Sequence, residues 1–337
     1  MAERLDVIVA GVGGNSRRWF KAMQDSGRWR AAAAVDPDPA ARKRAATEFG
    51  VEQSRLFESL RDALKRVAEA PVLVLTPSNS HRRPVEEALE AGRHVLSEKP
   101  MATEIADGRH MVALAQTAGR IYMVNQNYRY CGFARSFRAA LDGGEIGEPS
   151  FAEAYFHRLW PPSGYRASMP DVIVFEMCIH HLDLMRYWFG SDVAVVYARY
   201  PRAPWSGYAG APMVQALLRM ESGVSVAYSA SRQSRGLQTP YEGVWRVVGS
   251  KGSLHLADLG AGFGVYVDTG AGPARLVRSS EGMEPGFAAV LNEFADCIQT
   301  GREPETSGRD NIATLAAACA ITESARTGKE LAPSTLL

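Results

Sequence analysis

The 337 residues are enough for two domains of ordinary size, and a hydrophobic fraction of 46% is typical of chains with a buried core. With 38 basic and 37 acidic residues, the formal net charge is +1, so no cationic surplus is available to bind nucleic acid or an anionic membrane. The apolar run 7–12 is too short for a signal peptide or a membrane span. The four cysteines have no C-x-x-C spacing, so we expect a cytoplasmic protein with reduced thiols and no metal.

Strand-like and helix-like segments alternate through the first 124 residues. The predicted strands are residues 5–10, 31–35, 72–75, 94–96 and 121–124. The predicted helices are residues 17–26, 39–49, 59–69, 84–91 and 103–118. This alternation is typical of an α/β domain, in which helices cover both faces of a parallel sheet.

The second part of the chain has a different pattern. Helices are predicted at 133–141 and 172–189, and two more close the chain at 286–299 and 309–327. Between them lie strand-like segments at 193–199, 214–220, 224–231, 244–248, 253–257, 263–268 and 275–278. Strands joined by short glycine-containing turns predict an α+β domain with a large, mostly antiparallel open sheet. Residues 224–228 alternate apolar and small side chains, so we expect one sheet face to pack against a second copy in a homodimer or homotetramer.

A glycine cluster, Gly11-Val12-Gly13-Gly14-Asn15-Ser16, follows the first predicted strand and precedes the first predicted helix. This is the position of a dinucleotide-binding loop. Gly11 permits a tight turn, and Gly13 lets the backbone approach a pyrophosphate, which Gly14 and Asn15 would also border at the helix N-terminus. Ser16 stands where a third glycine is usual.

An acid, Asp36, ends the second predicted strand. A carboxylate there can accept hydrogen bonds from the adenosine ribose hydroxyls and repel a 2′-phosphate, which favours NAD over NADP. The alternative is that Asp36 only opens the turn that follows. Strand context, glycine spacing and acid together favour nucleotide binding.

Further motifs follow the later strands in a fixed order. They are Thr76-Pro77-Ser78-Asn79-Ser80-His81, Glu98-Lys99-Pro100 at the end of 91–100, Asn127-Tyr128-Arg129, and Glu176-Met177-Cys178-Ile179-His180-His181-Leu182-Asp183. In this order and spacing the set resembles the Gfo/Idh/MocA family, named for glucose–fructose oxidoreductase, inositol dehydrogenase and rhizopine catabolism. The resemblance extends over nearly the whole chain, and the Glu-Lys-Pro element in its context is its most specific part.

The resemblance implies an N-terminal Rossmann domain, for which we take residues 1–124, and a substrate-binding and oligomerisation domain, residues 125–337. It implies bound NAD(H) or NADP(H) and a sugar or cyclitol substrate. Thr76, Asn79 and His81 match the loop that lines the nicotinamide side of the cofactor. Glu98, Lys99 and Pro100 match the motif beside the cofactor whose lysine works in catalysis, and His180 matches the family's general base.

Two positions depart from the family pattern. The family often has aspartate four residues before the histidine, with glycine between them, whereas this chain has Glu176 and Cys178. Glu176 and His180 are four apart on a predicted helix and share a face, while His181 lies about 100° further round. A structural polar cluster is one alternative. A metal site built from these side chains is disfavoured, because Cys178 and His180 point to different sides of a helix.

Oxidation of a secondary alcohol needs a hydride acceptor, which nicotinamide supplies, and a base for the hydroxyl proton. We expect His180 to act as the base, Lys99 to stabilise the developing alkoxide and Glu176 to orient one of the two. These groups can meet only if the two domains enclose the substrate.

Other polar and aromatic residues are candidates for substrate contact. Asn127 and Arg129 could contact substrate or only fix the domain junction. Tyr165 and Arg166 belong to an aromatic, basic, loop-like stretch that suits a polyol but could equally lie in an interface.

Three functions remain open from the sequence. The first is an NAD-dependent dehydrogenase of a sugar, cyclitol or polyol. The second is an NAD-assisted lyase or glycosidase with transient oxidation, and the third is a non-catalytic, cofactor-sensing regulator. The presence of both Lys99 and His180 argues against the regulator.

Overall fold

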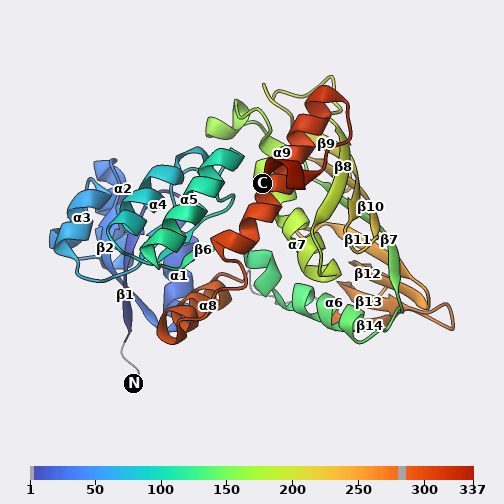
Figure 1. Cartoon of the computed structure of the whole chain (residues 1–337), viewed down its shortest axis with the longest axis horizontal. Coiled ribbons are helices and arrows are strands. Elements are labelled where there is room, and N and C mark those ends of the chain that lie inside the picture. Colours follow the sequence, from blue (N-terminus) through green and yellow to red (C-terminus); the bar gives the residue numbers. More distant parts are fainter. Residues whose placement is uncertain (1–3, 280–285) are drawn as a thin grey trace. The chain divides into compact units, whose positions relative to one another are not determined.

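The computed structural model describes residues 4–279 and 286–337, which form parts of two compact units (Figure 1). Unit 1 comprises Met1–Asn127 and Gly286–Leu315. Unit 2 comprises Tyr128–Pro285 and Ala316–Leu337. None of the helices in the described part of the chain combines the length and the apolar character needed for a membrane span.

Unit 1 contains a parallel sheet with the strand order β3-β2-β1-β4-β5-β6. The strands are β1 (Leu5–Ala10), β2 (Trp29–Val35), β3 (Leu56–Phe57), β4 (Val72–Val74), β5 (Val95–Ser97) and β6 (Tyr122–Val124). The predicted parallel α/β arrangement is confirmed, although the two-residue strand β3 was not predicted. The strand order reverses between β1 and β4, and the carboxyl ends at such a point form the usual ligand-binding crevice.

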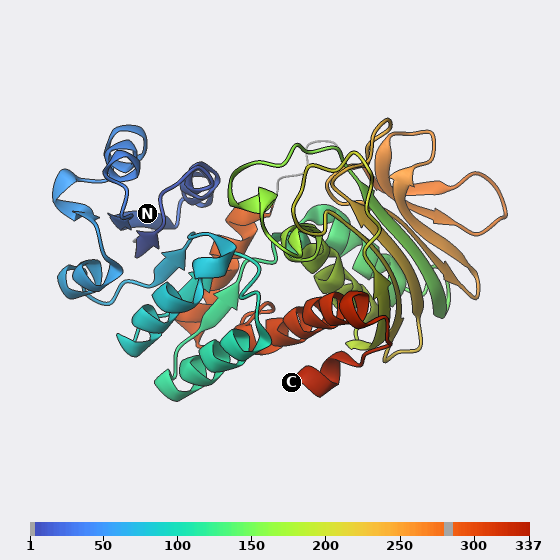
Figure 2. The same cartoon turned by 90° about the horizontal axis from the view of Figure 1, so that it is seen from above.

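Helices cover both faces of this sheet. They are α1 (Ser16–Ser26), α2 (Pro39–Phe49), α3 (Leu60–Arg66), α4 (Arg82–Glu90), α5 (Ile105–Ala118) and α8 (Phe287–Thr300). Helices α4 and α5 pack side by side on one face, and α1 packs with α8 on the other (Figures 1 and 2).

Helix α8 belongs to unit 1, whereas the sequence analysis assigned all residues after 124 to the second domain. The reason is aromatic packing between segments far apart in the sequence. Trp19 meets Phe287 edge-on with ring centroids 5.1 Å apart, and Trp29 stacks on Phe294 at 5.7 Å. The indole N–H of Trp29 also donates to the Leu291 carbonyl at 3.0 Å. Sequence patterns show that α8 is amphipathic but not which surface it covers.

Unit 2 contains an eight-stranded sheet with the order β14-β13-β12-β11-β7-β10-β9-β8. The strands are β7 (Pro149–His157), β8 (Val193–Arg199), β9 (Met213–Met220), β10 (Ser225–Ser231), β11 (Val244–Gly249), β12 (Gly252–Asp258), β13 (Phe263–Asp268) and β14 (Arg275–Ser279). All neighbouring pairs are antiparallel except β7 with β10, which is parallel. The mostly antiparallel sheet is therefore confirmed.

The central strand β7 was not predicted from the sequence. Its inward positions are Ala152, Ala154 and Phe156, while Phe151 and Tyr155 face outward. Two alanines carry little hydrophobic signal, so the alternation that marks a half-buried strand is weak here.

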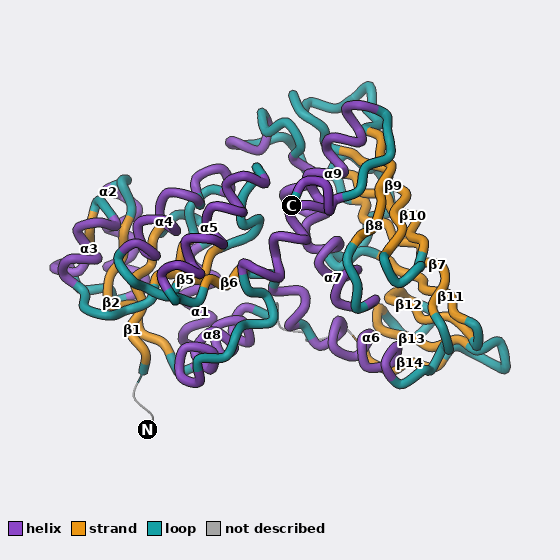
Figure 3. Tube along the Cα trace, in the orientation of Figure 1, coloured by secondary structure: helices purple, strands orange, loops and turns teal. Residues whose placement is uncertain are grey.

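One face of this sheet is covered by helices within unit 2. They are α6 (Gly132–Asp142), α7 (Ile179–Phe189) and the C-terminal part of α9 (Gly308–Thr327). The opposite face carries no helix in the described part of the unit, as the separation of helix and strand colours in Figure 3 shows. Trp188 on α7 anchors the covered face, because its ring packs 4.1 Å from Phe137 and 5.0 Å from Trp245.

The predicted helix 172–189 is not a uniform α-helix. Residues Val174–Cys178 form a π-helical turn, and α7 follows directly. Such π-turns are rare and are often found at functional sites. The turn contains Glu176 and ends two residues before His180.

Candidate active site

The glycine loop of unit 1 has the backbone that a nucleotide-binding turn requires. Gly11 has φ +94°, and a Cβ there would lie 2.8 Å from the Leu75 carbonyl carbon and 2.9 Å from the Thr76 nitrogen. Only glycine fits this close approach of the segment after β4. At Gly13 and Gly14 a Cβ would meet nothing within 4 Å, so the backbone there borders open space.

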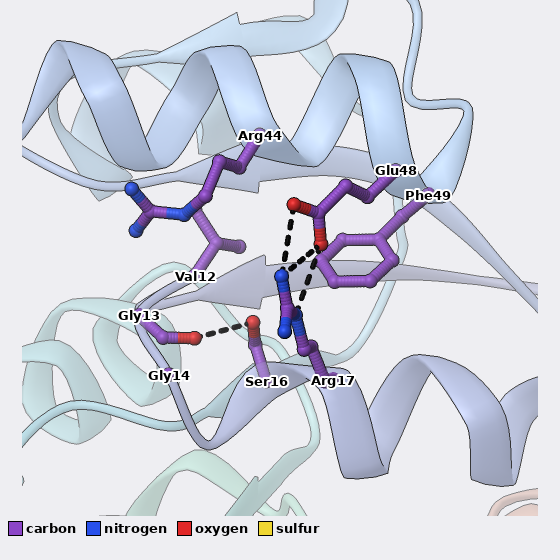
Figure 4. Close-up of a pocket in the computed structure, with 8 residues that line it drawn as sticks. All are labelled: Val12, Gly13, Gly14, Ser16, Arg17, Arg44, Glu48 and Phe49. Atoms are coloured by element: carbon purple, nitrogen blue, oxygen red, sulfur yellow. Dashed lines mark hydrogen bonds and ion pairs between the residues drawn. The ribbon is translucent and has the colours of Figure 1, made fainter.

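A pocket of about 210 Å³ lies beside this loop (Figure 4). Its lining residues are Val12, Gly13, Gly14, Ser16, Arg17, Arg44, Glu48 and Phe49. The Ser16 hydroxyl donates to the Gly13 carbonyl at 2.7 Å and stabilises the turn in place of the third glycine. Arg17 is bound by Glu48, whereas Arg44, from α2, brings a second guanidinium to the pocket wall. A helix N-terminus, open glycine backbone and a cation fit the phosphates of a dinucleotide.

Asp36 lies at the carboxyl end of β2 and is half-buried. One carboxylate oxygen accepts the Val12 backbone N–H at 2.9 Å, and the other accepts the Asp38 N–H at 2.9 Å. Asp36 therefore does open the following turn, and it also holds the glycine loop. Its carboxylate lies next to the pocket, at the position where the ribose hydroxyls of an adenine nucleotide would bind.

The Glu98 side chain is a buried hub of hydrogen bonds in unit 1. Oε1 accepts the Asn15 side-chain amide at 3.0 Å and the Trp19 indole N–H at 2.8 Å. Oε2 accepts the Lys99 backbone N–H at 3.1 Å and the Asn125 amide at 3.2 Å. One carboxylate thus joins the glycine loop, α1, the Lys99 backbone and the end of β6. Glu98 and Asn15, both predicted to contact cofactor, here bind each other.

The loop after β4 is joined to the same motif by His81. Its Nδ1 lies 2.8 Å from the Pro100 carbonyl and its Nε2 lies 2.9 Å from the Thr76 carbonyl. Burial lowers the pKa of His81, and a neutral imidazole can donate to only one of these carbonyls at a time. His81 is buried and Asn79 is exposed, so of these predicted cofactor residues His81 connects two loops and Asn79 faces solvent. The Lys99–Pro100 peptide bond is cis, and Lys99 is half-buried.

In unit 2, His180 occupies the first turn of α7 and is buried. Its ring stacks on Tyr128 with centroids 4.3 Å apart and an interplanar angle of 11°. The Tyr128 hydroxyl donates to the Tyr241 carbonyl at 3.2 Å. The imidazole plane is therefore fixed by a tyrosine that is itself held in place.

His181 has a different environment. It is fully buried, and its Nδ1 lies 2.6 Å from the Tyr228 hydroxyl on β10. Burial lowers the pKa of His181 to about 4, so the ring is neutral at pH 7. The two neighbouring histidines thus differ in their main contacts, since His180 stacks on Tyr128 and His181 binds the Tyr228 hydroxyl, which agrees with their separation around a helix.

Three of the predicted substrate residues bind buried acids. Arg129 makes a two-pronged ion pair with Asp183, with Nε–Oδ2 and Nη2–Oδ1 distances of 3.0 and 2.6 Å, and both side chains are buried. Tyr165 and Arg166 both donate to Glu176, the first from its hydroxyl at 3.0 Å and the second from Nε at 2.7 Å. Asn127 is buried in unit 1.

A metal site receives no support from this geometry. Among residues 4–279 and 286–337, no three His, Cys, Asp or Glu side chains gather closely enough to hold an ion. Glu176 is bound by Arg166 and His181 by Tyr228, so two of the proposed ligands already have protein partners.

Residues 5–126 match the family model described as the oxidoreductase family with an NAD-binding Rossmann fold, and residues 134–255 match the GFO/IDH/MocA C-terminal domain. A D-apiose dehydrogenase from Paraburkholderia graminis is 34% identical over 343 aligned positions, covering 97% of this chain and 89% of that protein. The chain belongs to the GFO/IDH/MocA oxidoreductase family.

Two further proteins illustrate the range of similarity. A 1,5-anhydro-D-fructose reductase from Ensifer adhaerens is 28% identical, covering 84% of this chain and 85% of that protein. The crystal structure of an oxidoreductase from Agrobacterium radiobacter, in complex with NAD+, L-tartaric acid and magnesium, superposes with a TM-score of 0.88. The two sequences are 26% identical, and the superposition covers 99% of this chain and 100% of the Agrobacterium radiobacter chain. Unit 1 thus has the NAD-binding fold of a GFO/IDH/MocA oxidoreductase.

Three residues that contact predicted site residues were themselves not predicted from the sequence. They are Trp19 and Asn125, which bind Glu98, and Tyr128, which stacks on His180. Tyr128 lies within the recognised motif Asn127-Tyr128-Arg129 and Asn125 lies two residues before it, so their position was a usable signal. Trp19 lies on the first helix, and only the fold brings it to Glu98.

Proposed function

We propose that this oxidoreductase is an NAD-dependent dehydrogenase that acts on a secondary hydroxyl of a sugar, a cyclitol or a related polyol. Two relatives that are 34% and 28% identical are named for sugar or sugar-derived substrates, and they align with 97% and 84% of this chain. The observation that carries the proposal is the Glu98 network, because it holds the Lys99 backbone against the loop that would bind the cofactor phosphates. Such preorganisation suits a lysine that acts on the substrate oxygen.

The proposed roles follow from the chemistry of alcohol oxidation. Bound nicotinamide would accept the hydride. His180 takes the hydroxyl proton, and stacking on Tyr128 keeps its ring in one plane. The Lys99 ammonium stabilises the negative charge that develops on the substrate oxygen. Gly13, Gly14 and Asn15 border the cofactor phosphates.

Kinetics of single variants test these roles. His180→Ala should reduce turnover by about 100- to 10,000-fold, the usual contribution of a general base. Lys99→Ala should have a similar effect, because the charge it stabilises appears mainly in the transition state. Binding of NAD+, measured by titration calorimetry, should change little in both. His181→Ala is the matched control and should keep more activity.

The reverse result for the two histidines would refute the assignment of the base. The substrate is found by screening sugars, cyclitols and sugar acids with NAD+ and NADP+ and following the absorbance of the reduced nicotinamide. Net formation of NADH supports a dehydrogenase. Product formation without NADH would instead indicate transient oxidation, and binding of NAD+ without any turnover would indicate a regulator.

We further propose a homodimer or homotetramer that uses the helix-free face of the unit 2 sheet. Small side chains of β10 face outward there, flanked on neighbouring strands by Leu217, Tyr155 and Phe151. Leu217 is 62% exposed, so a partner surface would remove apolar area from water. Leu217→Arg should lower the molar mass measured by light scattering. A monomeric parent at micromolar concentration would contradict the proposal.

We also propose that the enzyme works in the cytoplasm. All four cysteines lie in the described part of the chain, where none of them forms a disulfide, and three of them are buried. This pattern suits a reducing compartment. Fractionation of cells that express the protein, with detection by antibody, would test the location.

A further inference from the structure

Residues 161–168, here called the strap, project from unit 2 between two backbone anchors. The Trp160 N–H donates to the Arg232 carbonyl at 2.9 Å, and the Ala209 N–H donates to the Ala167 carbonyl at 3.0 Å. Between these points residues 161–165 are exposed to solvent. Because these residues are exposed, hydrogen bonds and ion pairs to the rest of unit 2 determine how the strap is held.

Both carboxylate oxygens of Glu176 bind the strap. Oε1 accepts the Tyr165 hydroxyl at 3.0 Å, and Oε2 accepts the Arg166 Nε at 2.7 Å. The guanidinium also lies over the Tyr165 ring, with Cζ 4.7 Å from the centroid. Glu176 is only 7% exposed whereas Arg166 is 42% exposed, so a buried acid holds a surface arginine.

We infer that Glu176 is a positioning residue, which anchors the strap through Tyr165 and Arg166 and cancels the charge of Arg166 beside the substrate. This rests on the proposed function, in which the substrate is a polyol. The sequence analysis expected Glu176 to orient His180 or Lys99. In the new assignment its carboxylate instead holds Tyr165 and Arg166 of the strap. Tyr165 and Arg166 then shape the substrate region, with the Tyr165 hydroxyl and the Arg166 Nε engaged by Glu176.

The charge balance has a consequence for substrate choice. Among the described residues, the terminal nitrogens of Arg166 have no protein partner, so they can donate to substrate hydroxyls. With Glu176 ionised the pair is neutral overall, which favours uncharged polyols over sugar acids. Removing the acid's charge leaves a partly exposed cation that attracts a substrate carboxylate.

Glu176→Gln tests the anchor without a change in side-chain size. The glutamine amide oxygen can accept a hydrogen bond, but the amide nitrogen cannot. The strap donor that faces the nitrogen therefore loses its bond. Hydrogen–deuterium exchange of the full chain should show amides of the strap exchanging about tenfold faster. Asp142→Asn is the matched control, because Asp142 is an exposed acid that also binds an arginine, Arg138, and it should leave the strap unchanged.

Steady-state kinetics supply the second measurement. In Glu176→Gln we expect KM for the polyol to rise about tenfold with little change in kcat, and the preference for a sugar acid over its neutral alcohol to increase about tenfold. The double variant with Arg166→Ala should lose that increase. The pH profile of kcat should stay as in the parent, because His180 remains the base.

Several outcomes would overturn the inference. A shifted pH profile of kcat with unchanged strap exchange would mean that Glu176 orients His180 instead. If Glu176→Gln fails to fold, Tyr165→Phe removes one strap donor at the surface, and unchanged exchange in that variant is equally damaging. If no polyol is oxidised by the parent, the proposed function fails, while the exchange experiment still decides whether Glu176 anchors the strap.

Discussion

Replacement of Glu98 by alanine tests the hub that joins the glycine loop to Lys99. Four donors would lose their acceptor, among them the indole N–H of the fully buried Trp19. A hydrogen bond to a charged group contributes about 1.5–3 kcal/mol, and a buried donor left unpaired costs about 1–3 kcal/mol. Because the four bonds share one carboxylate, their contributions do not add fully. We expect Glu98→Ala to lower the free energy of unfolding by about 3–5 kcal/mol.

Glu98→Gln should lower the free energy of unfolding less, by about 1–3 kcal/mol. The amide oxygen still accepts hydrogen bonds, whereas the amide nitrogen faces two donors from which it cannot accept. Unfolding is followed by tryptophan fluorescence in urea, and NAD+ affinity is measured by calorimetry. We expect about tenfold weaker NAD+ binding in the alanine variant, because Asn15 is no longer held at the loop.

Asp25→Ala is a suitable control, since Asp25 pairs with Lys21 on the exposed side of the same helix α1. Such a pair contributes less than about 1 kcal/mol. The reasoning is wrong if the free energy of unfolding of Glu98→Ala lies within about 0.5 kcal/mol of the parent value, because the hub then does not stabilise unit 1. It is equally wrong if Asp25→Ala lowers the free energy of unfolding as much as Glu98→Ala does.

Two further predictions concern cofactor choice and pH. Asp36→Ala should narrow the preference for NAD+ over NADP+ about tenfold, measured as the ratio of the two Kd values, and equal affinities in the parent would remove the argument for NAD. Because the pKa of buried His181 is about 4 in the fold and about 6.5 when unfolded, only the unfolded chain takes up its proton between these values. The free energy of unfolding should therefore fall by about 3 kcal/mol from this group as pH is lowered from 6.5 to 4, with His81 acting in the same direction. An equally steep decline in His181→Asn would contradict this account.

Local features were predictable from the sequence. Gly11 and Asp36 could be placed because strand, turn and helix follow one another within a short span. The different orientations of His180 and His181 follow from helical periodicity alone. The mostly antiparallel sheet was predicted, although β7 was missed where alanines occupy the inward positions.

Contacts between distant segments were not predictable. Nothing local shows that Arg129 will pair with Asp183, or that Arg166 will bind the Glu176 carboxylate. The π-turn at Val174–Cys178 also escaped, since its residues have ordinary helical patterning. For the two ion pairs, each carboxylate could have several partners, and only the fold selects among them.

The return of the chain to unit 1 after residue 285 constrains how the protein folds during synthesis. Residues 1–127 leave the ribosome first, but Trp29 and Trp19 are capped by Phe294 and Phe287, which are made much later. Until residues 128–285 have been translated, the nascent N-terminal half presents an uncovered aromatic surface. That half should therefore depend on chaperones while on the ribosome, and a fragment ending at residue 127 should aggregate when expressed by itself.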